Sequence, residues 1–150
     1  MTEKLNFRIY FKPGILVSQN KWPEYRICVD NVEYRHGFCT DELPIGFQAD
    51  LEEGEHKLQI SFTNKNHSRN TVTDQQGNIV EDLNLQIDKI EIDDIELGTL
   101  MQKSVYELDE EIEFSGKRIK TLPNHLFMSW NGTVTLTFTS PFYLWLLENL

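Results

Sequence analysis

The chain has 150 residues, of which 39% are hydrophobic and 11% aromatic, a composition typical of a globular protein that folds without disulfides or a structural metal. Its 24 acidic and 14 basic residues give a formal net charge of −10 at pH 7, and the basic residues form no dense run. Because phosphate backbones are bound by clustered Lys and Arg, this balance argues against nucleic acid as a partner. One domain over residues 1–150 is expected.

The N-terminal segment MTEKLNFRIYF has no apolar stretch before its first alternating pattern, which argues against a secretory signal peptide. The apolar clusters of the chain are shorter than the roughly 20 residues of a membrane helix, so no membrane contact is expected. Cys28 and Cys39 have the spacing of neither a disulfide framework nor a Cys-x-x-Cys metal site. We expect both to be reduced packing residues, and their pairing across neighbouring strands is the alternative.

Alternation of apolar and polar residues places one row of side chains on a core, and it predicts strands through the first half of the chain. In chain order we expect a strand over Leu5–Phe11 ended by Pro13-Gly14, a hairpin over Tyr25–Arg35 that turns at Asp30-Asn31, a strand over Phe47–Leu51, a turn at Glu53-Gly54 and a strand over Leu58–Phe62.

Beyond Glu81 the apolar positions change parity. They fall at odd numbers through Ile87 and at even numbers from Ile90, which predicts a bulge or bend at Asp88-Lys89. Asp93-Asp94 then predicts a turn into a return strand that ends at Gly98.

The last third of the chain begins with a weak pattern. Over Leu100–Pro123 it predicts an irregular segment or one helical turn, whereas Thr133–Thr139 gives the strongest strand signal of the sequence. Pro141 ends that strand, and Phe142–Leu150 predicts a short helix. Together the elements predict an all-β fold, an antiparallel β-sandwich of jelly-roll type, with a short C-terminal helix or extended anchor.

No nucleophile elbow, phosphate-binding glycine loop or His-Glu-x-x-His helix is present, so a non-enzymatic protein is expected. The histidines His36, His56, His67 and His125 are scattered without ligand spacing. Because His56 shares the parity of Leu58 and Ile60, we expect it to be a hydrogen-bonded histidine at the end of a core row.

The polar loop over Asn64–Asp82 supplies hard oxygen atoms of the kind that Ca²⁺ prefers, although it has no EF-hand spacing. Loops also collect Asn and Asp for turn geometry, so a calcium site and a plain loop both stay open. The candidate calcium ligands are Asn66, Asp74, Glu81, Asp82 and Asn84. No other cofactor is expected.

Aromatic residues are a second kind of candidate, since sugar rings stack on exposed Trp and Tyr. Trp22, Tyr25 and Tyr34 lie in or beside one predicted hairpin and form a candidate glycan platform. Tyr25 and Tyr34 lie at or near core parity, so core packing is the alternative interpretation.

The C-terminal run PFYLWLLENL is apolar on every side as a helix or as a strand, so it must be covered by its own domain or by a partner. Because chain ends usually lie at the surface, we expect it to dock in part into a neighbouring subunit. The candidate interface residues are Phe142, Tyr143, Leu144, Trp145, Leu146 and Leu147.

The segments PEYRICVDNVEY, GEHKLQISFTNK and EDLNLQIDKIEID resemble the jelly-roll frame of calcium-dependent xylan-binding and related carbohydrate-binding modules, over Pro23–Ile95. Asp82, Asn84 and Leu85 match the start of one strand of that frame, but Leu83 stands where the family has a basic residue, and the loop lacks the aromatic-rich sugar motif. The resemblance implies a calcium-dependent glycan-binding sandwich.

The segment DLNLQIDKIEIDDIELG and the ending WNGTVTLTFTSPFYLWLLENL resemble small acidic β-proteins of marine contractile-tailed cyanophages. This second resemblance implies a virion component, located in the particle after synthesis in the host cytoplasm. The expected function is therefore structural, as a capsid decoration, neck or tail protein that contacts other virion proteins or itself as a homo-oligomer. The alternative is a calcium-dependent carbohydrate-binding module.

Overall fold

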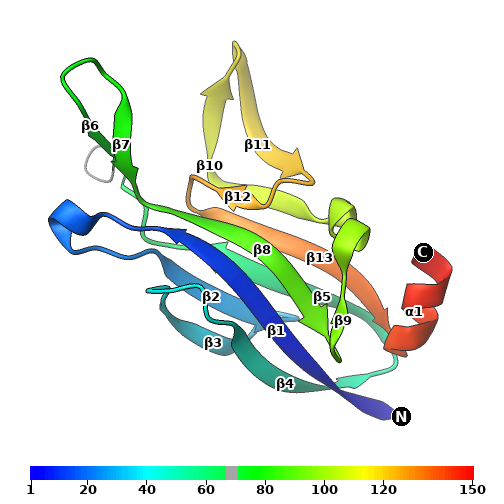
Figure 1. The fold of residues 1–150 in the computed structure, drawn as a ribbon. Coiled ribbons are helices and arrows are strands. Elements are labelled where there is room, and N and C mark those ends of the chain that lie inside the picture. Colours follow the sequence, from blue (N-terminus) through cyan, green and yellow to red (C-terminus); the bar gives the residue numbers. More distant parts are fainter. Residues whose placement is uncertain (67–70) are drawn as a thin grey trace.

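The computed structural model of the protein describes residues 1–66 and 71–150, and its strands form two facing antiparallel sheets (Figure 1). A five-stranded sheet has the order β12 (Phe127–Met128), β8 (Asn84–Ile92), β1 (Thr2–Gly14) and β4 (Ile45–Glu52), with β9 (Ile95–Glu96) paired to β8. A six-stranded sheet has the order β11 (Lys117–Pro123), β10 (Val105–Phe114), β13 (Gly132–Ser140), β5 (Gly54–Phe62), β2 (Glu24–Val29) and β3 (Val32–Phe38).

Consecutive strands pass between the two sheets: β1 lies in one, β2 and β3 in the other, and β4 and β5 repeat the exchange. The expected antiparallel β-sandwich of jelly-roll type is confirmed. Its core consists of the inward rows of both sheets, and Phe7, Phe11, Ile60, Phe62 and Phe138 are each at most 1% exposed. Period-two burial along these strands follows directly from the alternation in the sequence.

The predicted irregularity in β8 is confirmed by its pairing with β1. Tyr10 pairs with Lys89 and Phe11 pairs with Ile87, so Asp88 is the extra residue of a bulge. The bulge lets Ile87 and Ile90, which have opposite parity, both point into the core, where each is 1% exposed.

Two predicted turns are also confirmed, and both use the left-handed backbone that two-residue hairpin turns require. Asp30 and Asn31, with φ of 52° and 67°, join β2 to β3, and Asp93 and Asp94, with φ of 50° and 64°, join β8 to β9. Asp and Asn tolerate this conformation better than other residues with a Cβ.

The prediction of an irregular segment over Leu100–Pro123 is wrong for most of its length. A 3₁₀ helix, η2 (Gly98–Lys103), supplies one helical turn, but β10 and β11 then form a hairpin around Ser115 and Gly116, with φ of 52° and 80°. The strand pattern is obscured because the β10–β11 register shifts between Glu107 and Ile112.

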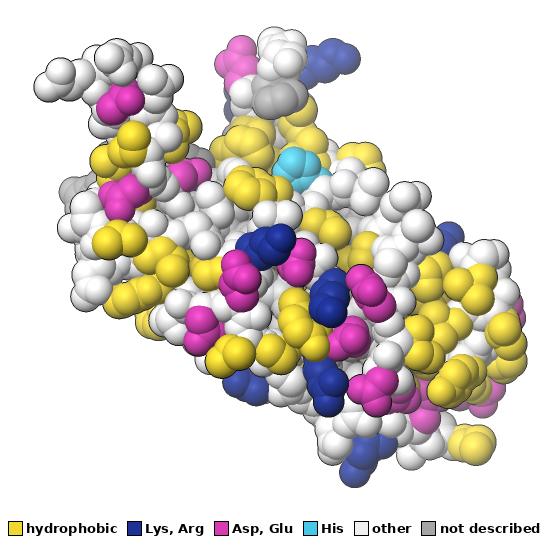
Figure 2. All heavy atoms as spheres, viewed as in Figure 1, with side chains coloured by type: hydrophobic (Ala, Val, Ile, Leu, Met, Phe, Trp, Pro, Cys, Tyr) yellow, Lys and Arg dark blue, Asp and Glu magenta, His cyan; other side chains and the backbone are white. Residues whose placement is uncertain are grey.

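The polar loop over Asn64–Asp82 contains a second small hairpin, of β6 (Thr71–Thr73) and β7 (Ile79–Asp82). The β6–β7 and β10–β11 hairpins both project from the top of the sandwich in the view of Figure 1, and they stand apart in Figure 2. His67 lies outside the described residues.

The chain ends in the helix α1 (Phe142–Asn149), and Phe142, Trp145 and Leu146 bury themselves against the core. α1 lies at the same end of the sandwich as the start of β1 (Figure 1), and the backbone N–H of Phe142 donates to a carboxylate oxygen of Glu3 at 3.1 Å. Among the described residues, no helix has the length and apolar character needed to cross a membrane.

Candidate functional site

A cleft of about 460 Å³ lies where β5 ends, β10 changes register and β13 begins. Its walls come from segments far apart in the sequence and combine an indole ring, amides and carboxylates. The lining residues are Lys65, Asn66, Asp109, Glu110, Glu111, Ile112, Trp130 and Asn131.

Asn131 holds three segments of the cleft wall together. Its side-chain Oδ1 accepts from the backbone N–H of Lys65 at 2.7 Å, and its Nδ2 donates to the carbonyl of Lys65 at 3.0 Å. Its own carbonyl accepts from the N–H of Asp109 at 3.0 Å. One amide side chain therefore satisfies both backbone groups of Lys65 and fixes the loop after β5 against β13.

The backbone of Trp130 is fixed by Tyr106 of β10. The Tyr106 hydroxyl donates to the carbonyl of Trp130 and accepts from its N–H at 3.2 Å. Tyr106 is fully buried, and burial raises the pKa of its phenol well above the usual value, so it stays a neutral donor. The half-buried Trp130 side chain packs on the core and lines the cleft, which places an aromatic surface at the cleft wall.

Asp109, Glu110 and Glu111 are consecutive exposed residues of β10 that line the cleft. Arg118 on β11 contacts Glu111, with Nε 2.9 Å from the carboxylate, and Lys120 donates to the carbonyl of Asp109 at 2.7 Å. Carboxylates accept strong hydrogen bonds from hydroxyl groups, so an indole with adjacent carboxylates and amides suits a polyhydroxylated ligand.

The candidate calcium ligands near the β6–β7 hairpin are hydrogen-bonded within the protein. Asp74 accepts from the backbone N–H groups of Gln76 and Asn78, each at 2.9 Å, and bonds with Asn78 and Gln76 lower its pKa. Glu81 accepts from the side chain and the N–H of Ser18 in the 3₁₀ helix η1 (Val17–Gln19), and these bonds lower its pKa. The two carboxylates thus fix a turn and a helix end.

The other three candidate calcium ligands each have a different structural environment. Asp82 contacts the ammonium of Lys65, Asn84 packs against Gly14, and Asn66 lines the cleft. Over residues 1–66 and 71–150, no group of three or more His, Cys, Asp and Glu has the arrangement of a metal site. Calcium requires six to eight oxygen ligands, whereas the carboxylates of Asp74, Glu81 and Asp82 each accept from donors of the protein and are not gathered around one point in the described residues.

The structure does not bring Trp22, Tyr25 and Tyr34 together as an exposed platform. Tyr25 is a core residue, 6% exposed, whose ring centre lies 5.6 Å from that of Phe11. Tyr34 stacks on Phe47 with ring centres 5.1 Å apart. Trp22 is half-buried, and its carbonyl accepts from Asn64 at 3.0 Å.

The C-terminal run divides into two faces of α1. Phe142, Trp145 and Leu146 pack on the protein's own core, whereas Tyr143, Leu144 and Leu147 are 63%, 54% and 71% exposed. Figure 2 shows apolar side chains gathered over this end of the molecule, at the right of the view.

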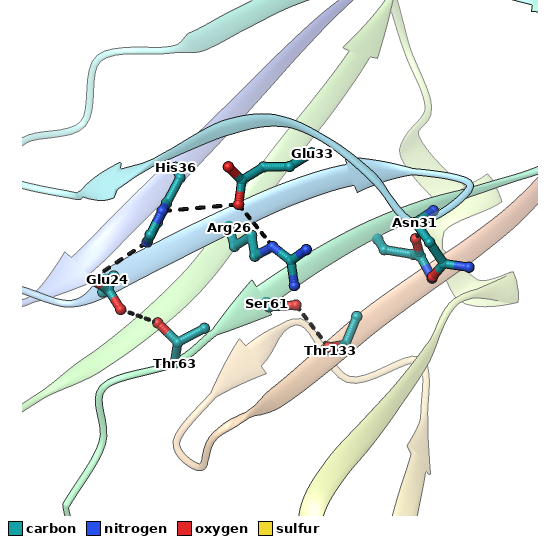
Figure 3. A network of polar contacts seen from close by, with 9 residues as sticks. Glu24, Arg26, Asn31, Glu33, His36, Ser61, Thr63 and Thr133 are labelled. Atoms are coloured by element: carbon teal, nitrogen blue, oxygen red, sulfur yellow. Dashed lines mark hydrogen bonds and ion pairs between the residues drawn. The ribbon is translucent and has the colours of Figure 1, made fainter.

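The outer face of the six-stranded sheet carries a polar network that links neighbouring strands (Figure 3). Arg26 donates to Glu33 at 2.8 Å, Thr63 donates to Glu24 at 2.5 Å, and a nitrogen of His36 lies 3.5 Å from a Glu24 carboxylate oxygen. Because these charged and polar side chains pair with one another across strands, they stabilise this face of the sheet. Their hydrogen-bonding atoms are therefore used within the protein.

His56 and the cysteines have structural roles. The two ring nitrogens of His56 lie 2.6 Å from a carboxylate oxygen of Asp30 and 2.6 Å from the carbonyl of Glu52. Both partners can only accept, so the arrangement suits an imidazolium that donates twice. Cys28 and Cys39 are buried and free, as expected, and burial raises the pKa of Cys39 to about 11.

Of the cleft residues, Asn66 was a candidate from the sequence, as a calcium ligand, and the other lining residues were not. The run Trp130-Asn131-Gly132 at the start of a strong strand and the three consecutive acidic residues Asp109–Glu111 were visible signals. Nothing local in the sequence indicated that these runs meet the loop after β5, because the contact between Lys65 and Asn131 spans 66 positions.

No family model matches the chain, and no curated protein matches its sequence. Two solved structures have a similar fold, and both belong to the class of sandwich-fold carbohydrate-binding modules. One is vCBM60 in complex with galactobiose, with a TM-score of 0.52 and 12% identity over 87% of this chain and 96% of that chain. The other is a selenomethionine form of vCBM60, described with a circular permutation that links two families of calcium-dependent carbohydrate-binding modules. It has a TM-score of 0.54 and 13% identity over 88% of this chain and 89% of that chain.

Proposed function

We propose that the protein binds carbohydrate, without catalysis, in the cleft between the β5 end and the β10–β11 hairpin. The observation that carries the proposal is the cleft itself, which combines the half-buried Trp130 with three carboxylates and two amides. The fold shared with vCBM60 supports the same class of ligand. The aromatic surface would take the apolar face of a sugar ring, and the carboxylates would accept from its hydroxyl groups.

The test is binding of the purified protein to galactobiose and to neutral galactan and xylan, measured by calorimetry and by retardation in polysaccharide-containing gels. Glu110 is exposed and lines the cleft, so Glu110→Gln should fold normally and weaken binding by about tenfold, since a charge-assisted hydrogen bond becomes a neutral one. Trp130→Ala should abolish binding, although the ring also packs on the core.

The matched control is Glu55→Gln, which removes the same charge from an exposed position at the opposite end of β5. It should leave binding unchanged. Equal losses in Glu110→Gln and Glu55→Gln, or no binding of any glycan in the panel, would contradict the proposal.

A second candidate function is assembly through α1, and the observation that favours it is the exposed apolar face of that helix. Tyr143, Leu144, Leu147 and the terminal Leu150 are 63%, 54%, 71% and 89% exposed. Apolar side chains gathered at one surface favour contact with another protein. A place in a virion, with contacts to other virion proteins or to a second copy, stays a prediction that rests on the sequence resemblance.

Sedimentation tests this second candidate. Removing residues 142–150 would also remove Phe142, Trp145 and Leu146 from the core, so a substitution on the outer face is the sharper experiment. If the face joins copies of the chain, the wild type should sediment as an oligomer and the double variant Leu144→Lys, Leu147→Lys as a monomer with unchanged thermal unfolding. A monomeric wild type at high concentration would rule out self-assembly through α1.

A further inference from the structure

Lys65 is a buried lysine at the wall of the cleft. Its side chain is 2% exposed, and its ammonium contacts a carboxylate oxygen of Asp82 and donates to the carbonyl of Leu83 at 2.6 Å. Burying an ammonium is costly unless it is paired and hydrogen-bonded, so these contacts hold Lys65 in one geometry.

The partners of Lys65 join several segments. The Asp82 oxygen that contacts the ammonium also accepts from the hydroxyl of Thr71 at 2.8 Å, which connects the first residue of β6 to the last of β7. Asn131 holds the backbone of Lys65 from the β13 side. The ammonium therefore lies where the cleft wall, the β6–β7 hairpin and the start of β8 meet.

The oxygens around this ammonium are of the kind that would otherwise take a metal ion. A carboxylate, a backbone carbonyl and a hydroxyl are hard ligands suited to calcium, and Asp82 is one of the candidate calcium ligands from the sequence. In this protein a covalently attached cation already neutralises the carboxylate. Asp74 and Glu81, the other two carboxylates of the candidate set, bind donors of their own.

We propose that Lys65 acts as a built-in cation that fixes the cleft wall, so that this sandwich folds and binds without a divalent metal ion. The role of Lys65 in glycan binding rests on the proposed function. Its role in the cleft wall does not, because the effect of Lys65 on the stability of the protein is measured in the absence of any glycan.

The first experiment compares thermal unfolding of the wild-type protein in excess EDTA with unfolding in excess CaCl₂. We expect no measurable difference between the two, because an ion that binds only the folded state would raise the midpoint temperature in proportion to the logarithm of its concentration. A higher midpoint with calcium, reversed by EDTA, would overturn the proposal.

The second experiment removes the ammonium. Lys65→Met leaves the Asp82 carboxylate without its cation and should lower the midpoint of unfolding by roughly 10 °C. The double variant Lys65→Met, Asp82→Asn removes both charges and should recover most of the loss, and it also provides a folded protein if the single variant does not fold. An unchanged midpoint in Lys65→Met would overturn the proposal.

The third experiment separates the charge of Lys65 from its bulk. Lys65→Ser opens space beside the oxygens of Asp82 and Leu83, so methylammonium chloride should raise its midpoint more than the same concentration of tetramethylammonium chloride, which cannot donate hydrogen bonds. Lys57→Ser, on the exposed part of β5, is the matched control and should respond equally to both salts. Equal responses in Lys65→Ser would contradict a cation role, whereas absence of glycan binding by the wild-type protein, with the stability results as expected, would contradict only the proposed function.

Discussion

Gly132 shows how one residue without a side chain determines the packing of two strands beside the cleft. A Cβ at this position would lie 2.4 Å from the carbonyl oxygen of Glu107 and 2.8 Å from a ring carbon of Tyr106. Both neighbours belong to β10, so β13 can approach β10 this closely only with glycine at its first position.

Gly132→Ala should therefore lower the free energy of unfolding by about 1–3 kcal/mol, because the backbone of β10 must shift to make room. The matched control is Gly46→Ala in β4, where a Cβ would meet its nearest atom, the carbonyl oxygen of Phe7, at an ordinary 3.6 Å. That change should leave stability unchanged or raise it by up to about 1 kcal/mol. Denaturant titration of both variants checks the difference, and equal effects would show that the close approach has no energetic weight.

For single residues, the sequence largely predicted which side chains are buried, but it did not predict which side chains form the cleft. Residues such as Leu58, Ile60 and Phe62 reveal their face by alternation, which is a local property. Asn131 gives no such sign, since its role depends on a backbone that lies far away in sequence. His56 was predictable in part. Its parity in the strand predicted a hydrogen-bonded residue, but nothing in the sequence predicted that Asp30 and Glu52 would be its partners.

Among the elements, hairpins were predictable where the turn chemistry was strong and the flanking pattern clean. The Asp30-Asn31 and Asp93-Asp94 turns met both conditions. The β10–β11 hairpin has a turn of the same kind at Ser115-Gly116, but its strand β10 carries consecutive acidic residues where the register shifts, which hides the period of two.

The helix α1 was expected as an anchor, and the structure divides it into a buried face and an exposed face. Trp145 and Phe142 stack on each other, with ring centres 5.9 Å apart, and both contact Phe138 of β13. That contact explains why a run apolar on all sides is stable here, since half of it completes the end of the core. The exposed half is the part that assembly would use.

For the molecule as a whole, charge would limit the ligands of the proposed binding cleft. The net charge is −10, and Asp109, Glu110 and Glu111 add a local negative field that Arg118 offsets in part beside Glu111 and Lys120 beside Asp109. Neutral glycans avoid this repulsion, whereas carboxylated polysaccharides do not.

We therefore expect neutral galactan to bind more tightly than polygalacturonate at low salt. The difference should narrow as salt is added, because the Debye length falls to about 8 Å at physiological ionic strength. Retardation in gels that contain either polymer, at two salt concentrations, measures this. Tighter binding to the carboxylated polymer at low salt would contradict the expected charge preference.

The strand β13 also determines how the molecule could be attached to something else. It begins at Gly132 beside the cleft and ends at Ser140 beside α1, and a nine-residue strand spans about 30 Å. The start of β1 and the helix α1 share that far end (Figure 1), so a linker or support joined to either terminus would leave the cleft facing outward. Copies displayed in this way on one surface could engage a single polysaccharide chain together, and weak individual contacts would then add up to strong attachment.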